Sequence, residues 1–209
     1  MTKQILLSRR LLLPVSAALL ALAGCGSLIG PSGPPPQIYR LAPEFSAAAG
    51  GTSVMWQLSV ARPNSTQTLD SERIALSRGA MMDYFADSQW NDTVPRLLQS
   101  LLVEAFERSG RISAVGQESE GLHTDYMLAT ELRDFDAQYD SANGAPLVVV
   151  DISAKLVDQR GKVIAARETH QTARASQNSV PSVVNAFDQA TSAALTDLAT
   201  WALQAPPPS

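Results

Sequence analysis

The sequence predicts an α+β domain in which two main helices pack on one side of a mixed or mainly antiparallel sheet. Three observations support this prediction. Apolar residues recur with helical spacing in two segments, they alternate with polar residues in several shorter segments, and the segments follow one another as strands, helix, short strand, three longer strands and helix. Helices that cover one face of a sheet satisfy this order.

The clearest helix is expected from about Thr93 to Ser109. Asp92 can cap its start, Pro95 falls in the first turn where a missing N–H costs nothing, and Gly110 is placed to end it. Spacings of three and four residues put its apolar side chains on one stripe, which contains Val94, Leu97, Leu98, Leu101, Leu102, Ala105 and Phe106. We therefore expect one face of this helix to be buried.

A second helix is expected from about Val180 to Leu203, after Ser179 and with Pro181 in its first turn. Its apolar side chains repeat at helical spacing as Val183, Val184, Phe187, Ala190, Ala194, Leu195, Leu198 and Trp201. Several alanines lie among them. Because alanine is small, we expect this helix to approach the sheet closely along its whole length.

The strands are clearest in the second half of the chain. From Leu147 to Val157 apolar residues alternate with mainly polar ones, and a turn at 159–162 leads into Val163 to Arg174, so these two segments predict a hairpin. A third long strand is expected from Tyr126 to Phe135. Shorter strands are expected at Trp56 to Val60, Arg73 to Ser77, Met81 to Phe85 and Ile112 to Val115.

The first 24 residues have the build of a secretory signal peptide. Lys3, Arg9 and Arg10 precede an apolar run from Leu11 to Ala23. This run is shorter than the roughly 20 apolar residues that a transmembrane helix needs, so we expect a targeting segment and not a permanent anchor. At its end, Leu22-Ala23-Gly24-Cys25 matches the lipobox that the lipoprotein signal peptidase reads.

Cys25 is the predicted lipidation site. By this likeness its thiol carries a diacylglyceryl group, and the amino terminus made by cleavage is acylated with a chain such as palmitate. The alternative is an ordinary secreted protein with a chance cysteine, but Cys25 is the only cysteine in the chain. Since each buried methylene contributes about 0.8 kcal/mol, two or three acyl chains make a stable anchor.

Residues 25–36 are rich in glycine and proline and are expected to form a tether between the lipid and the domain. The domain is expected over 37–204, and the proline-rich tail 205–209 is expected to be disordered. Gly26 stands where enteric bacteria commonly place an aspartate that retains a lipoprotein in the inner membrane. This favours the outer membrane, with the domain facing the periplasm.

The mature chain is acidic. Cleavage removes three of the 16 Lys and Arg and none of the 20 Asp and Glu, which leaves 13 against 20 and a net charge of −7. Nucleic acid and anionic lipid headgroups are poor partners for this charge. We therefore expect no nucleic-acid binding, and we expect membrane attachment through the lipid on Cys25.

No motif indicates catalysis or a cofactor. The two histidines, His123 and His170, are far apart in sequence, and no cluster or HExxH spacing indicates a metal site. A GxSxG elbow and a glycine-rich phosphate loop are also absent. Two carboxylate pairs have the spacing of solvated positions, Asp134 with Asp136 and Glu118 with Glu120. We therefore predict no catalytic residue, no cofactor and no metal.

Residues 81–90 contain more methionine and aromatic side chains than the rest of the chain. Such side chains suit adaptable apolar contacts with a partner or with lipid, and the candidate contact residues are Met82, Tyr84, Phe85 and Trp90. The alternative is that alternate members of this segment fill the core beneath the first helix, as such residues generally do.

Several short motifs together resemble a known family. The lipobox is followed by Tyr39-Arg40-Leu41, a strand that ends at Pro63, the run from Leu69 to Ala75, and the run from Tyr84 to Trp90 before the helix. This succession is similar to the ABC-type transport auxiliary lipoprotein family. Members of that family accompany mammalian-cell-entry (MCE) type lipid transporters and paraquat-inducible transport systems. The likeness covers nearly all of the mature chain, although each motif is short and degenerate.

The resemblance implies a periplasmic accessory lipoprotein without enzymatic activity, which works beside an ABC permease and an MCE-domain protein. Among the motif residues only Cys25 is carried over with a defined role. The leading hypothesis is docking onto the MCE component through an exposed sheet edge or the aromatic segment, and self-association into a homo-oligomer is left open. Two alternatives are an outer-membrane assembly or structural lipoprotein unrelated to transport, and an envelope hydrolase.

Overall fold

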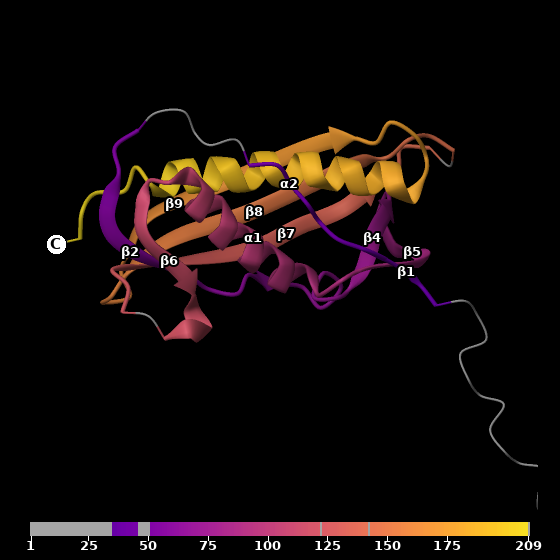
Figure 1. Cartoon of the computed structure of the whole chain (residues 1–209). Coiled ribbons are helices and arrows are strands. Elements are labelled where there is room, and N and C mark those ends of the chain that lie inside the picture. The colour runs from indigo at the N-terminus through magenta and orange to yellow at the C-terminus, as the bar shows by residue number, and fades with distance from the viewer. Residues whose placement is uncertain (1–34, 46–50, 122, 142, 209) are drawn as a thin grey trace, which may run out of the picture. The chain divides into compact units, whose positions relative to one another are not determined.

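Strand β7 (Tyr126–Gln138) organises the sheet, which has nine strands within the part of the chain that the structure describes. This computed structural model describes residues 35–45, 51–121, 123–141 and 143–208, so the predicted signal peptide, Cys25 and most of the tether lie outside it. Residues Pro36–Ser209 make one compact unit. The fold is α+β with a mixed sheet (Figure 1), as the sequence predicts.

One edge of β7 pairs antiparallel with β8 (Leu147–Asp158) along its whole length, and β8 pairs in the same way with β9 (Val163–Arg174). The other edge of β7 is shared by three short parallel strands. They follow each other along it as β2 (Val54–Val60), β3 (Asn64–Ser65) and β4 (Arg73–Arg78).

Three further strands extend the sheet beyond these short strands. Strand β6 (Ile112–Gln117) adds to β2 in parallel, β5 (Met81–Trp90) adds to β4 as an antiparallel hairpin, and β1 (Gln37–Tyr39) adds to β5 in parallel. The helices are α1 (Val94–Ser109) and α2 (Val180–Ala202), with a short 3₁₀ helix η1 (Glu118–Glu120). No helix described here combines the length and apolar character that crossing a membrane requires.

Both α-helices lie on one face of the sheet, α2 along β8 and β9 and α1 along β2 and β6, and they also touch each other (Figure 1). The alternation expected for β8 places five side chains in this layer, Val148, Val150, Ile152, Ala154 and Leu156, each at most 2% exposed. An aromatic cluster forms the other part of the core. The ring of Phe187 lies 4.7 Å from Phe135 and 5.3 Å from Trp90, between centroids.

The ends of α1 agree with the sequence prediction except at its first cap. Gly110 ends the helix in the left-handed conformation at φ 61°, which glycine adopts without steric cost. Thr93 and not Asp92 is the residue that precedes the first turn. Asp92 instead accepts a hydrogen bond from the Thr93 backbone N–H at 2.7 Å. The carboxylate lies one position too early to reach the N–H groups of the first turn.

The tail differs from the expectation of disorder at one point. The Tyr126 hydroxyl donates a hydrogen bond to the Pro206 carbonyl oxygen at 2.9 Å, so the chain beyond α2 is fixed against the start of β7. The Tyr126 ring also packs edge-on against Trp56 of β2, with the centroids 5.3 Å apart. The hydrogen bond to Pro206 gives the proline-rich segment a partner that its composition does not indicate.

Candidate interaction surfaces

Four strands have a free edge among the described residues: β1, β3, which has only two residues, β6 and β9. Strand β9 is the longest of them, with 12 residues against six in β6 and three in β1. Along such an edge, N–H and C=O groups of alternate residues point outward without a partner strand. The outer edge of β9 is therefore the longest row of available backbone groups in the described part of the domain.

The charged side chains of β9 that accompany this edge are held in ion pairs. Their partners come from α2, from β7 and from the loop before β8, in the pairs Arg167 with Asp197 (2.7 Å), Glu168 with Arg133 (2.9 Å) and Arg174 with Asp140 (3.4 Å). Charges on an edge strand normally oppose the addition of another strand. In β9 part of that opposition is neutralised within the chain.

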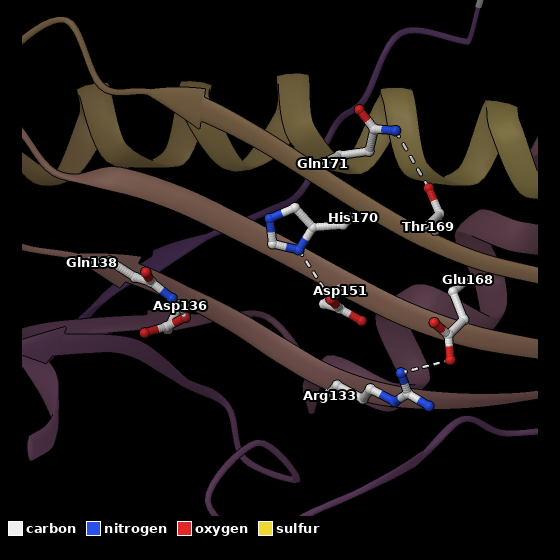
Figure 2. Close-up of polar contacts among 8 residues, drawn as sticks. All are labelled: Arg133, Asp136, Gln138, Asp151, Glu168, Thr169, His170 and Gln171. Carbon is white, nitrogen blue, oxygen red and sulfur yellow. Dashed lines mark hydrogen bonds and ion pairs between the residues drawn. The ribbon is translucent and has the colours of Figure 1, made fainter. Parts of the chain in front are cut away.

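The face of the sheet opposite the helices is polar at its centre (Figure 2). An irregularity in the pairing between Leu132 and Asp134 inserts Arg133 as an extra residue, and Arg133 reaches across to Glu168 of β9. Beside this ion pair, His170 Nδ1 lies 3.0 Å from Asp151 Oδ2. We call this face, with Arg133, Asp134, Asp136, Asp151, Glu168 and His170, the polar face.

Acidic groups outnumber basic groups on the polar face. Asp134 pairs with Asp151 across the strands, and its carboxyl also lies near Asp136. Asp134 is exposed overall, yet partial burial of its carboxyl, followed by the charges of Asp136 and Asp151, raises its pKa, against a smaller opposite effect of His170. The polar face therefore favours a positively charged partner group over a negative one.

These groups do not assemble into a recognisable catalytic site. Among residues 35–45, 51–121, 123–141 and 143–208, no three His, Cys, Asp or Glu side chains converge in a way that could hold a metal ion. Glu120 of the second carboxylate pair accepts a hydrogen bond from the Gln117 backbone N–H and is exposed. That the chain is not an enzyme and needs no cofactor stays a prediction.

The predicted contact segment is divided between surface and core. Met82 is 49% exposed, and Tyr84 is half-buried with its hydroxyl hydrogen-bonded to the Thr68 carbonyl oxygen at 3.0 Å. Phe85 is half-buried against the Tyr139 ring, 6.4 Å away between centroids. Trp90 is 0% exposed. Its assignment as a contact residue is therefore corrected, because the side chain fills the aromatic core and presents no surface to a partner.

Sequence reasoning missed the segment 40–45, which follows β1 and runs over the helices. The Ala42 backbone N–H donates to Asp188 Oδ1 of α2 at 2.7 Å, and the Ser192 hydroxyl of α2 donates to the Glu44 carbonyl oxygen. Leu41 is buried in the core and Phe45 packs against it. We call residues 40–45 the strap. It fixes β1, the first strand after the predicted tether, to the helical layer.

Comparison with known proteins gives a family. The family described as ABC-type transport auxiliary lipoprotein component matches residues 39–199. An uncharacterized protein of Bradyrhizobium diazoefficiens is 27% identical over 185 residues, which cover 88% of this chain and 50% of that protein. The chain thus spans about half the length of this curated relative.

Solved structures agree with the fold. The crystal structure of protein XCC0632 from Xanthomonas campestris superposes with a TM-score of 0.75 and 28% identity, over 80% of this chain and 94% of that one. A second uncharacterized protein superposes with a TM-score of 0.64 at 15% identity, over 81% of this chain and 99% of that one. The second likeness shows the fold alone.

Proposed function

Because this chain belongs to the family of ABC-type transport auxiliary lipoprotein components, we propose that it is the membrane-anchored accessory subunit of an MCE-type lipid transport system. Family membership places it in the cell envelope as a lipoprotein. The acyl chains on Cys25 hold it to a membrane, and Gly26 favours the outer membrane, with the domain facing the periplasm.

The outer edge of β9 is the proposed docking site for the MCE component. A partner segment in extended conformation can add to this edge as a further strand, since main-chain hydrogen bonds supply affinity whatever the sequence. The edge is 12 residues long and its charges at Arg167, Glu168 and Arg174 are already paired within the chain. This free edge is the observation on which the docking proposal depends.

The polar face supplies selectivity in this proposal. A strand added to β9 continues the sheet, so every second side chain of that strand lies on the same side as His170 and Glu168. Asp134 and Asp136 lie on β7, two strands inward from β9, so their acidic excess adds a weak long-range preference for lysine or arginine at those positions of the partner. A tethered domain also raises the local concentration of the docking edge near its membrane, which strengthens weak contacts.

Photo-crosslinking in intact cells tests the proposal with the full lipidated chain. A photoreactive residue replaces Ala166, which is exposed on β9, and the matched control replaces Asn185, which is exposed on α2. The expected adduct contains the MCE-domain protein and forms from position 166 and not from position 185.

Three results would contradict docking through β9. Equal adducts from both positions would show that the edge has no special role. Adducts with an outer-membrane assembly machine would support the alternative of an assembly lipoprotein. A crosslinked pair of copies of this chain would assign the β9 edge to self-association and leave the MCE component to another surface.

A further inference from the structure

The end of the β4–β5 hairpin carries exposed apolar side chains. Five large apolar side chains are exposed among the described residues, and three of them, Ile38, Met81 and Met82, belong to β1 and β5. Met81 is 69% exposed and Met82 49%. Between Arg78 and Asp83 the chain reads Gly-Ala-Met-Met, so the hairpin end has four consecutive residues without charge. We call residues 78–82 the hairpin tip.

The two methionines lie on opposite faces of the hairpin. Met81 is paired with Arg78 and Met82 with Ser77, and successive residues of a strand point to opposite sides. A flat protein surface that covered one methionine would leave the other in water. An approach along the hairpin axis, into a soft apolar medium, covers both. A lipid surface offers that medium, and methionine side chains adapt to it.

The beginning of β1 and the tip point in the same direction along the sheet. Strand β1 runs parallel to β5, with Gln37 beside Ser88, so the beginning of β1 points in the same direction as the beginning of β5, where Met81 and Met82 lie. Cys25 precedes Gln37 by 12 positions. At about 3.3–3.6 Å per residue, those positions span at most about 43 Å, so the lipid anchor keeps β1 within this distance of the membrane.

The charge at the base of the tip also suits a headgroup layer. The Arg78 guanidinium lies 5.0 Å from the centre of the Tyr139 ring, and Arg73 lies 3.7 Å over the Tyr84 ring. Within the described residues neither arginine joins an ion pair. Guanidinium groups hydrogen-bond phosphate oxygens well. Asp83 follows Met82 on the other strand of the hairpin, so Arg78 is the one cationic group directly at the tip that can meet the phosphates.

We propose that the hairpin tip is a membrane-contact site, which enters the headgroup region of the bilayer that holds the lipid on Cys25. Met81 and Met82 reach the boundary of the acyl chains, about 5–10 Å into the interface, while Arg78 remains among the phosphates. The contact fixes the orientation of the domain and so the direction in which the β9 edge faces. The inference rests on the lipid anchor of the proposed function and is independent of the docking partner.

A fluorescent label on the tip tests this contact. Because lipid blocks the thiol of Cys25, the only cysteine, a single Met82→Cys substitution in the full lipidated chain gives one labelling site for an environment-sensitive dye. Met55→Cys is the matched control, since Met55 is 84% exposed on β2. In phosphatidylcholine vesicles we expect emission from position 82 to shift to shorter wavelength and to be quenched by lipids with brominated acyl chains, while position 55 shows neither effect.

Two results would overturn the proposal. In one, the label at position 82 behaves like the label at position 55. In the other, its emission shifts but brominated lipid does not quench it, which indicates a protein contact. A second variant leaves both methionines unlabelled as the tested groups: Met81→Gln with Met82→Gln should abolish the quenching of a dye at Ala80→Cys, whereas Met55→Gln should not. If the protein instead fails to stay on vesicles at all, the lipid anchor fails, which separates the two proposals.

Discussion

The backbone N–H of Ala42 donates a hydrogen bond to Asp188 Oδ1 at 2.7 Å, across 146 positions of sequence. This bond joins the strap to the middle of α2, and buried Leu41 lies directly before it. A pull on β1 from the predicted tether would therefore pass into β5 through the strand pairing and into the helical layer through the strap. The half-buried Asp188 carboxyl has a raised pKa because burial outweighs the hydrogen bond from Ala42, which lowers it.

Asp188→Ala should release the strap without unfolding the domain. The substitution removes the acceptor of the Ala42 N–H, and the loss of one hydrogen bond to a charged group costs about 1.5–3 kcal/mol of unfolding free energy. Hydrogen exchange measured at the Ala42 amide should become faster, while amides in the middle of β8 keep their rates. Exchange at this amide is the direct readout because the bond itself protects it.

Asp188→Asn is the control for this prediction, since the amide oxygen can still accept the same hydrogen bond. We expect it to preserve slow exchange at Ala42. If the alanine and asparagine variants exchange at equal rates, the strap is held by its apolar contacts through Leu41 and Phe45, and the Asp188 bond is incidental.

Trp90 and Met82 lie in the same strand, but truncation of Trp90 should destabilise the domain strongly and truncation of Met82 should have little effect. Trp90 is fully buried against Phe135 and Phe187, so Trp90→Ala leaves a cavity and should lower the unfolding free energy by about 3–5 kcal/mol. Met82 is half exposed, and Met82→Ala should change it by no more than about 0.5 kcal/mol. Urea denaturation of both variants checks this difference, and similar losses for the two would contradict the division of β5 into surface and core.

The helices and strands that the sequence predicts are those long enough to show a regular repeat of apolar residues. Strand β9 begins and ends where expected, and β8 and both helices differ by one residue at an end. Strands β1 and β3, with three and two residues, show no period and were not predicted. Their places depend on pairing with β5 and β7, which no local pattern encodes.

Residues 81–90 show why the sequence alone does not separate surface side chains from core side chains, since a strand with a bulge does not alternate them regularly. The pairing of β5 with β4 changes register between Arg73 opposite Gln89 and Ala75 opposite Tyr84, so β5 contains extra residues there. Asp87 within this bulge has φ 52°, an uncommon value for a residue other than glycine. The bulge changes which side chains of β5 face inward, and the Trp90 side chain after it points into the core. Cys25, by contrast, is predicted from a contiguous motif that needs no tertiary information, and it lies outside the described residues.

The acidic polar face should make stability depend on pH through Asp134. Partial burial and the neighbouring Asp136 and Asp151 raise its pKa above the ordinary value of 3.8, so the folded state binds this proton more tightly than the unfolded state does. Its favourable contribution is therefore complete below about pH 3.8 and is lost as pH rises through the raised pKa. Asp134→Asn, which cannot ionise, should be more stable relative to the parent at pH 7 than at pH 4. Urea midpoints measured across this range check the sign, and a difference that stays constant or reverses with pH would contradict the raised pKa of Asp134. High salt should reduce the part of the difference that comes from Asp136 and Asp151, because it screens charges near the surface, and should leave the part that comes from burial.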